Sequence, residues 1–371
     1  MKIEEYNYWL ANLNNIGNIK ISTLLEVFDD AEEIFKASKE KIIKRLNDNP
    51  RTVGKLKKKD IDGLVSKRDI KTIKDSYNRL KQRGIYFVTI GDEEYPSRLK
   101  NIYGAPFGLY YRGKLPDENR KSLAIVGARN CSPYGREMAK FFATTVAKED
   151  IIVISGLARG IDTYAQQGAV EVEGETYSVM GCGVDICYPK ENINLFMDIL
   201  SKGGIISEFP PGTSPLPGHF PMRNRIISGL ADGILVIEAR EKSGSLITVD
   251  MGLDQGKDIF ALPGRVTDRL SEGCNNLIKM GAKLVTNPQE VLEELIPHYH
   301  QNPGQSKIKV NSLEQKEKMV YASLSFDPKH IEDISLITNL TIDELMKHLL
   351  DLELRGLVRQ TMKNYYVSTK I

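Results

Sequence analysis

The central part of the chain, from about Lys121 to Pro297, alternates short runs rich in Ile and Val with longer segments of helical character. Runs that are apolar throughout are typical of parallel strands that helices cover on both faces. The expected strands are residues 123–126, 151–154, 176–180, 204–207, 233–237, 258–262 and 283–285. The expected helices are residues 136–148, 163–172, 193–201, 225–230, 246–255 and 275–280. This alternation predicts an α/β fold with a Rossmann-like, doubly wound, mostly parallel sheet.

The amino-terminal part, residues 1–83, has apolar residues at the spacing of helices. Within it, residues 13–25 predict a helix-hairpin-helix, or SAM-like, arrangement with its turn at Gly17. The backbone N–H groups of such a turn can bind a DNA phosphate, and a bundle that only packs is the open alternative. Residues 85–90 then predict a strand, and the aromatic run at 109–111 predicts extended chain packed on the next domain.

The carboxyl-terminal part, residues 311–371, predicts a winged helix, which is a module that binds DNA or proteins. The expected elements are helices at 313–324, 330–337 and 342–354 and strands at 357–360 and 365–367. The third helix carries the acidic residues Asp343, Glu344, Asp351 and Glu353. Because acidic side chains repel the phosphates of DNA, this helix favours a protein contact over the role of a transcription factor.

These patterns divide the chain into four parts. We expect an N-terminal helical domain over residues 1–84, an extended Rossmann-like domain over 85–297, a linker rich in Gln, Asn, Pro, Gly and Ser over 298–310, and a winged-helix domain over 311–371.

The net charge of the 371-residue chain is only +2, so its overall charge indicates no nucleic-acid partner. One stretch is strongly basic, however, and Asp48 is its only acidic residue. It contains Lys41, Lys44, Arg45, Arg51, Lys55, Lys57, Lys58 and Lys59. Such a stretch can attract a polyanion, and a solvated helical face is the alternative.

Several classes of protein are excluded by simple patterns. The longest apolar runs have the length of strands, and the amino terminus has no apolar signal region, so we expect no membrane segment and a cytoplasmic protein. No C-x-x-C pair occurs among Cys131, Cys182, Cys187 and Cys274. We therefore expect free thiols, no metal site and no cofactor.

Four loops follow predicted strands and are rich in Gly, Ser and Arg. In an open parallel sheet ligands bind at the carboxyl ends of the strands. Glycines allow the backbone to approach a phosphate, Arg donates to phosphate oxygens, and the next helix adds free N–H groups. The loops span residues 127–135, 155–162, 208–227 and 242–248, and the third is proline-rich and predicted to be extended. In the second loop, Asp162 suits an N-cap.

A dinucleotide fingerprint and a Walker A sequence are both absent from the first strand–helix turn. Four such loops exceed what one nucleotide requires, and Phe220 among arginines suits a base-stacking groove. The sequence therefore predicts a groove for single-stranded DNA. The candidate DNA-binding residues are Gly127, Arg129, Ser132, Tyr134, Gly135, Ser155, Gly156, Arg159, Gly160, Phe220, Arg223, Asn224, Arg225, Ser243, Gly244 and Ser245.

The alternative is a nucleotide-binding enzyme of the nucleoside phosphoribohydrolase type. Such an enzyme needs a P-G-G-x-G-T-x-x-E motif, whose Glu assists glycosidic cleavage. Pro211-Gly-Thr-Ser and residues 243–248 resemble parts of this motif, but neither is followed by that Glu. No pair of a nucleophile and a base is evident either, so we expect no catalytic residue and no enzyme.

The loops resemble those of the DNA-processing protein A (DprA/Smf) family. The matching motifs are G-A-R-x-x-S-x-Y-G at 127–135, S-G-x-A-x-G-I-D at 155–162, Y-P-x-x-N at 188–192, F-P-x-R-N-R-I-I at 220–227, S-G-S-L-I-T at 243–248 and A-x-P-G at 261–264. The resemblance covers the whole central domain, and the flanking regions have the family's usual arrangement.

The resemblance implies a protein that binds single-stranded DNA with little sequence preference. It implies that the protein loads RecA recombinase onto incoming strands during natural transformation and helps to displace single-strand-binding protein. Arg129 and the loop 155–162 would contact phosphates, and Phe220 would stack on a base or hold it in a pocket. The groove would be completed by Asn224, Ser243 and Ser245.

The resemblance also implies a homodimer through residues 273–284. Its candidate contacts are Asn275, Ile278 and Leu284. Two features depart from the family pattern: Pro217 stands where relatives often carry Lys, and Asn275 or Asn276 stands where they often carry His.

Overall fold

The computed structural model describes residues 1–297, 299, 313–355 and 357–368. Its contacts divide the chain into two compact units, Met1–Ile296 and Pro297–Ile371. Most of the predicted linker 298–310 lies outside the described residues. The boundary predicted between residues 84 and 85 falls inside the first unit and stays a prediction.

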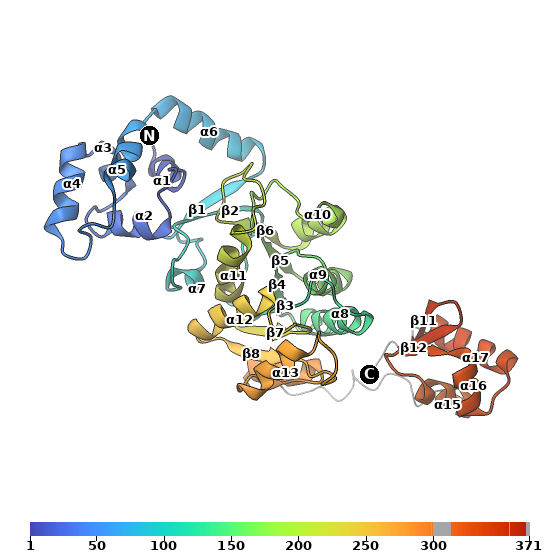
Figure 1. The fold of residues 1–371 in the computed structure, drawn as a ribbon. Coiled ribbons are helices and arrows are strands. Elements are labelled where there is room, and N and C mark those ends of the chain that lie inside the picture. The colour runs from blue at the N-terminus through green and yellow to red at the C-terminus, as the bar shows by residue number, and fades with distance from the viewer. Residues whose placement is uncertain (298, 300–312, 356, 369–371) are drawn as a thin grey trace. The chain divides into compact units, whose positions relative to one another are not determined.

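Within the described residues, nine strands form the sheet of the first unit (Figure 1). Their order is β1 (Tyr86–Thr89), β2 (Gly108–Gly113), β6 (Gly204–Ser207), β5 (Thr176–Val179), β4 (Ile152–Ser155), β3 (Ser122–Val126), β7 (Gly233–Val236), β8 (Asp258–Ala261) and β9 (Lys283–Leu284). The strands from β6 to β9 are parallel, and β1 and β2 add an antiparallel edge. The predicted α/β fold is confirmed, and residues 109–111 belong to the sheet as part of β2.

Helices cover both faces of this sheet, which explains why every residue of β3 to β7 is buried. One face carries α8 (Pro133–Lys148), α9 (Ile161–Glu171) and α10 (Ile193–Lys202), and α14 (Pro288–Leu295) packs on α8. The other carries α11 (His219–Leu230) and α12 (Gly244–Asp254), and α13 (Glu272–Lys279) packs on β8. Short helices α7 (Ser97–Lys100) and η1 (Lys190–Asn192) complete the unit.

Helix α11 begins at His219, six residues before the predicted helix, so the third loop is not extended over its whole length. The sequence suggested an extended segment because of its many prolines. Pro221, however, lies in the first turn of α11, where a proline costs little because the N–H that it lacks would have no partner within the helix. The helix therefore carries Phe220 and Asn224, which were predicted on a loop.

The order of the strands places a switch point between β3 and β7. From β3 the chain adds β4, β5 and β6 on one side, and β7 then returns to the other side of β3. In doubly wound sheets the crossovers diverge at such a point and leave a crevice at the carboxyl ends of the two strands. The fold therefore opens a site beside residues 127–130 and 237–243.

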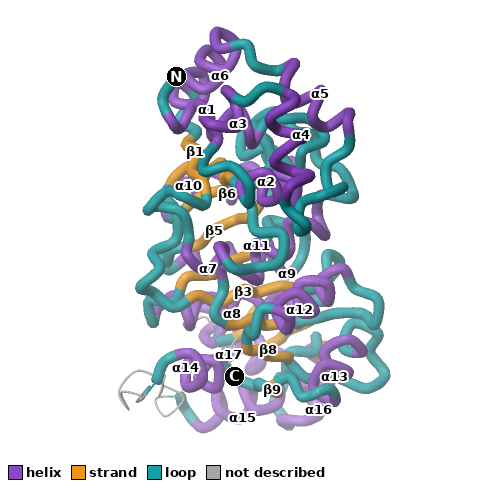
Figure 2. The backbone as a smooth tube through the Cα atoms, turned by 90° about the vertical axis from the view of Figure 1, so that its left-hand side faces the viewer, coloured by secondary structure: helices purple, strands orange, loops and turns teal. Residues whose placement is uncertain are grey.

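The N-terminal helices are α1 (Ile3–Ala11), α2 (Asn18–Leu25), α3 (Ala31–Lys36), α4 (Lys39–Asp48), α5 (Lys58–Ser66) and α6 (Ile70–Gln82), and they surround a core of their own. Figure 2 shows them at one end of the sheet. The first residue of α2, just after the turn at Gly17, bonds to residues that flank the sheet: the Asn18 amide donates to Glu208 Oε2 at 2.9 Å and accepts from the Phe107 N–H at 3.0 Å. The side chain at this turn therefore serves packing.

The second unit has the predicted winged-helix pattern. Its elements are α15 (Gln315–Ser323), β10 (Lys329–His330), α16 (Ile331–Thr338), α17 (Ile342–Leu354), β11 (Val358–Met362) and β12 (Tyr365–Ser368). The sequence did not predict β10, which pairs with β12. On α17, an exposed apolar row runs at four-residue intervals through Ile342, Met346, Leu350 and Leu354.

None of the helices in the described part of the chain is long and apolar enough to cross a membrane. The four cysteines are free thiols, and two of them, Cys182 and Cys274, are buried. Over the same described ranges, no three His, Cys, Asp or Glu side chains gather as a metal site would require.

The contact between Asn18 and the sheet leads to a stability prediction. We expect Asn18→Ala to lower the free energy of unfolding by about 1–3 kcal/mol, because it removes a partner of the buried Glu208 carboxylate. Urea unfolding measures this change. Asn47→Ala, at an exposed position on α4, should stay within about 0.5 kcal/mol of the parent protein. Equal stability of the two variants would contradict the packing role.

Candidate nucleic-acid interface

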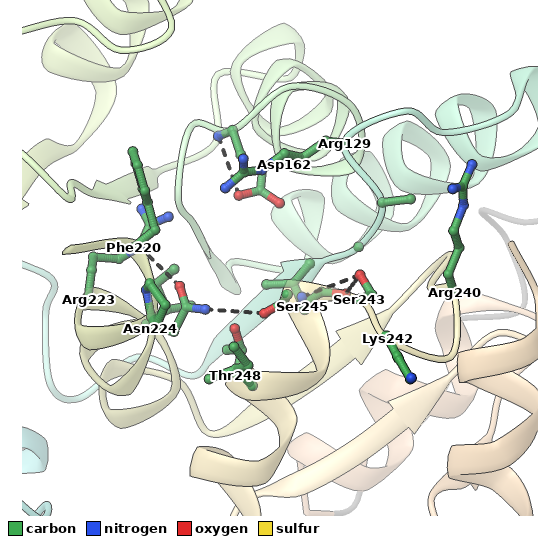
Figure 3. A pocket seen from close by; sticks show the side chains of 18 of the residues that line it. Arg129, Asp162, Phe220, Arg223, Asn224, Arg240, Lys242, Ser243, Ser245 and Thr248 are labelled. Carbon is green, nitrogen blue, oxygen red and sulfur yellow. Dashed lines mark hydrogen bonds between the residues drawn. The ribbon is translucent and has the colours of Figure 1, made fainter. Parts of the chain in front are cut away.

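A cleft of about 560 Å³ lies at the switch point of the sheet (Figure 3). Its walls come from the loops after β3, β4 and β7 and from the first turns of α11 and α12. The lining residues include Gly127, Arg129, Asn130, Ala158, Tyr188, Phe220, Asn224, Arg240, Lys242, Ser243 and Thr248. The size is that of a pocket for a small organic group.

An aromatic pair forms one wall of the cleft. The ring centroids of Phe220 and Tyr188 are 5.5 Å apart with planes at 33°, and the Arg129 guanidinium lies 5.5 Å from the Phe220 ring. Gly181 makes room for this ring, because a Cβ there would lie 2.9 Å from Phe220 Cδ1. An aromatic face next to an exposed cation is suited to stacking on a nucleobase while binding its phosphate.

The other wall is cationic and rich in hydroxyl groups. Arg240 and Lys242 are exposed on the loop after β7, and Figure 3 shows them on the same side of the cleft as Ser243. Ser243 caps α12, and its Oγ lies 2.8 Å from Ser245 Oγ. The Asn224 amide donates to the Gly244 carbonyl at 3.4 Å. The amino end of α12 therefore faces the cleft, and the positive end of its helix dipole favours an anion there.

Arg223, a predicted DNA contact, is instead buried beneath the cleft with 4% of its surface exposed. Its guanidinium donates to the Gly156 carbonyl at 2.9 Å and to the Val179 carbonyl. Burial lowers the pKa of Arg223 to about 10, so it remains charged at neutral pH. A Cβ at Gly156 would lie 2.4 Å from this guanidinium, which is why glycine is needed there.

Asp162 supports the same loop rather than capping the helix, as the sequence suggested. Its carboxylate accepts from the N–H groups of Gly156 at 3.1 Å and Ala158 at 3.4 Å. Burial raises the pKa of Asp162, and the positive charge of Arg223 opposes that rise. The N-cap of α9 is Gly160, whose φ of 75° is unfavourable for other residues.

The predicted residues of the first loop mostly hold the loop together. The Ser132 hydroxyl donates to Glu238 Oε1 at 2.5 Å and accepts from the Gly135 N–H at 3.0 Å. A Cβ at Gly135 would lie 2.3 Å from Glu238 Oε2. Burial raises the pKa of Glu238, and the bonds from Ser132 counteract this. Tyr134 is half-buried.

Three further candidates do not line the cleft. The buried Ser155 hydroxyl donates to the Ile125 carbonyl at 2.7 Å. Arg159 is exposed and pairs with Glu191. Arg225 pairs with the buried Glu208 carboxylate, which also accepts from Asn18.

The sequence did not single out Arg240, Asn130 or Thr248, all of which line the cleft. Arg240 and Asn130 follow strands β7 and β3. Because ligands of an open parallel sheet bind at the carboxyl ends of its strands, this rule could have pointed to both residues. Thr248 lies one turn after Ser245 on α12, and only the orientation of that helix brings it to the cleft.

The residues predicted for a dimer contact lie around the edge strand β9. The Asn275 side chain bonds both the N–H and the carbonyl of Gly264, at 3.2 and 3.1 Å. Ile278 is half-buried against the sheet core. Leu284 is 46% exposed on β9, and Met280 at the end of α13 is 78% exposed.

Comparison with known proteins gives consistent results. Residues 86–296 match the family model described as DNA recombination-mediator protein A, and residues 309–361 match the DprA winged helix domain. The chain is 36% identical over 301 residues to Protein Smf of Escherichia coli K12, covering 80% of each chain.

Two solved structures are also similar. DNA processing protein A from Streptococcus pneumoniae has a TM-score of 0.69 and 34% identity, covering 81% of this chain and 100% of that one. The same protein from Helicobacter pylori, whose structure concerns a single-stranded DNA binding mode, has a TM-score of 0.52 and 29% identity. That match covers 58% of this chain and 97% of the other.

The buried Asp162 carboxylate, which accepts from two backbone N–H groups and carries a charge opposite to that of Arg223, leads to a prediction for the cleft. We expect Asp162→Ala to lower the free energy of unfolding by about 1–3 kcal/mol, because the N–H groups of Gly156 and Ala158 lose their acceptor and the buried guanidinium loses a nearby negative charge. Urea unfolding gives the value. The matched change Asp198→Ala, at an exposed position on α10, should alter stability by less than about 0.5 kcal/mol. A loss below about 1 kcal/mol in Asp162→Ala would argue against this electrostatic support.

Proposed function

The chain belongs to the DNA recombination-mediator protein A family, and on this basis we propose that its cleft binds single-stranded DNA for the loading of RecA recombinase. The family role is DNA processing and recombination. The proposal adds the ligand, the site and the partner.

The observation that carries the proposal is the group of Phe220, Tyr188 and Arg129 at the mouth of the cleft. An aromatic ring stacks on any base, because every base has a π-face, so a wall of this kind supports binding with little sequence preference. Arg129 places a guanidinium 5.5 Å from the same ring, within reach of the phosphate of a stacked nucleotide. The similar Helicobacter pylori structure concerns a single-stranded DNA binding mode.

A strand of DNA fits this site better than a single nucleotide does. The cations are spread along the carboxyl edge of the sheet, with Arg129 after β3 and Arg240 and Lys242 after β7. The amino end of α12 adds a further anion position beside Ser243. Several separate phosphate positions around one base-sized wall are suited to successive nucleotides of a polymer.

We further propose that the bound strand is handed to RecA, with displacement of single-strand-binding protein, in the cytoplasm during natural transformation. Membership in a recombination-mediator family supports this role. A cleft that binds bases and phosphates without base-edge recognition would accept any incoming sequence.

The nucleoside phosphoribohydrolase alternative would need a free carboxylate at the cleft. Glu208 and Glu238 end their strands, but Glu208 pairs with Arg225 and Glu238 bonds Ser132. Asp162 is occupied by backbone N–H groups. These contacts favour a binding protein, and release of ribose 5-phosphate from nucleoside monophosphates would overturn that conclusion.

We expect the double variant Arg129→Ala/Phe220→Ala to bind oligo-dT more weakly, with the lost stacking alone costing about 1–3 kcal/mol. Fluorescence anisotropy over a salt series measures this, and assembly of RecA filaments on the same strand should fall in parallel. Tyr103→Ala/Lys148→Ala removes an exposed aromatic and a cation outside the cleft and should bind like the parent protein. Unchanged affinity in the folded cleft variant would refute the assignment.

We also propose that two copies pair through the edge strand β9, where Met280 and Leu284 expose apolar side chains. An unpaired edge strand with apolar neighbours is a natural site for association. Leu284→Glu places a charge on this edge and should convert dimers to monomers in light-scattering measurements. Met197→Glu, on an exposed position of α10, should leave the dimer intact. A dimer that persists in Leu284→Glu would place the interface elsewhere.

A further inference from the structure

The N-terminal helices carry a concentration of positive charge that the proposed function does not use. Residues 1–84 contain 19 Lys and Arg against 13 Asp and Glu, a net charge of +6, whereas the whole chain has +2. The remainder of the chain is therefore net negative. The family models match residues 86–296 and 309–361 and do not extend over these helices.

The structure separates the paired from the unpaired cations of the basic stretch. Lys41 and Arg45 are held by Glu33, with distances of 3.2 and 2.8 Å. The others are exposed and have no ion pair within the described residues. We call them the basic surface: Lys44 on α4, Arg51 and Lys55 on the following loop, Lys57 before α5, and Lys58 and Lys59 in its first turn.

This surface has a fixed framework. The buried Thr52 hydroxyl donates to the Leu46 carbonyl at 2.8 Å, which ties the loop to the end of α4. Leu56 packs against the core of the N-terminal helices. Gly54, in the loop that joins α4 to α5, makes a turn with a φ of 74°. Helices α4 and α5 also pack together. The cations are therefore presented by an ordered loop and two packed helices.

The placement of two of these lysines is unfavourable for the isolated chain. Lys58 and Lys59 lie in the first turn of α5, where the helix dipole disfavours positive charge. The one acidic residue in this turn, Asp60, is buried and paired with Lys20 at 2.9 Å. Local stability would select acidic residues at these positions, so the lysines point to an anion supplied from outside.

The chemistry of the surface identifies the kind of anion. Residues 39–59 contain no Phe, Trp, Tyr or His, so this surface has no aromatic side chain to stack on a base. Lysine is a point charge suited to phosphate groups, and a row of lysines without aromatics binds the backbone of a nucleic acid irrespective of sequence. This differs from the cleft, where Phe220 and Tyr188 provide stacking.

We propose that the basic surface is a second binding site for the sugar–phosphate backbone of the strand whose bases enter the cleft. The proposal rests on the proposed function, since it assigns a further stretch of the same ligand. The site adds affinity and salt dependence for long strands without adding sequence preference.

The test compares two lengths of oligo-dT: the shortest that the parent protein binds, and one beyond the length at which its affinity stops rising. In Lys55→Gln/Lys58→Gln/Lys59→Gln, loss of three phosphate contacts should reduce the salt slope for the long strand by about 2 and weaken its binding about tenfold at low salt. Binding of the short strand should not change.

The matched control is Lys114→Gln/Lys121→Gln/Lys148→Gln. It has the same change in net charge, but its lysines lie near the amino ends of the parallel strands, whereas the cleft lies at their carboxyl ends. It should bind both strands like the parent protein. An equal loss in both triple variants would overturn the proposal, because the effect would then be one of net charge alone.

A second variant separates binding from folding. Lys58→Glu/Lys59→Glu should keep or raise the melting temperature, because acidic residues favour the first turn of a helix, while long-strand binding falls. Unchanged long-strand binding in this variant would overturn the proposal and indicate an acidic protein as the partner of the surface. If the parent protein binds neither strand, the proposed function itself fails.

Discussion

The buried guanidinium of Arg223 is the interaction on which the cleft depends. It joins three elements, because Arg223 lies on α11 and donates to carbonyls of the loop after β4 and of strand β5. Asp162 supplies a negative charge that opposes the cost of burying this guanidinium, and it fixes the same loop through the N–H groups of Gly156 and Ala158. Phe220 lies one turn before Arg223 on α11, so the position of the aromatic wall follows from this anchor.

Polar residues of the same type perform different tasks around the cleft according to their burial. Buried polar groups need hydrogen-bond partners within the protein. The buried Arg223 therefore donates to the carbonyl groups of Gly156 and Val179, whereas the exposed Arg129 and Arg240 are left to face the cleft. The loops are stabilised by one set of side chains and present another to a ligand, which lets the site be rigid and charged at once.

Charge is distributed unevenly over the chain. The N-terminal helices are strongly basic, and the cleft is lined by cations on both walls. Helix α17 of the winged-helix unit instead combines acidic residues with the exposed apolar row from Ile342 to Leu354. In the proposed function the basic regions contact the single-stranded DNA. Helix α17, which is acidic and partly apolar, is suited to protein contacts.

The sequence by itself determined the α/β fold, the helices at both ends and the loops that form the site, because the apolar period and the glycine-rich turns are local properties. It also pointed to Phe220 and Arg129, both of which line the cleft. Only the tertiary structure decided that Arg223 and Arg225 are internal supports, that α11 begins at His219, and that Arg240 joins the cleft. The direction and burial of a side chain depend on how distant elements pack, and neither follows from the spacing of residues along the chain.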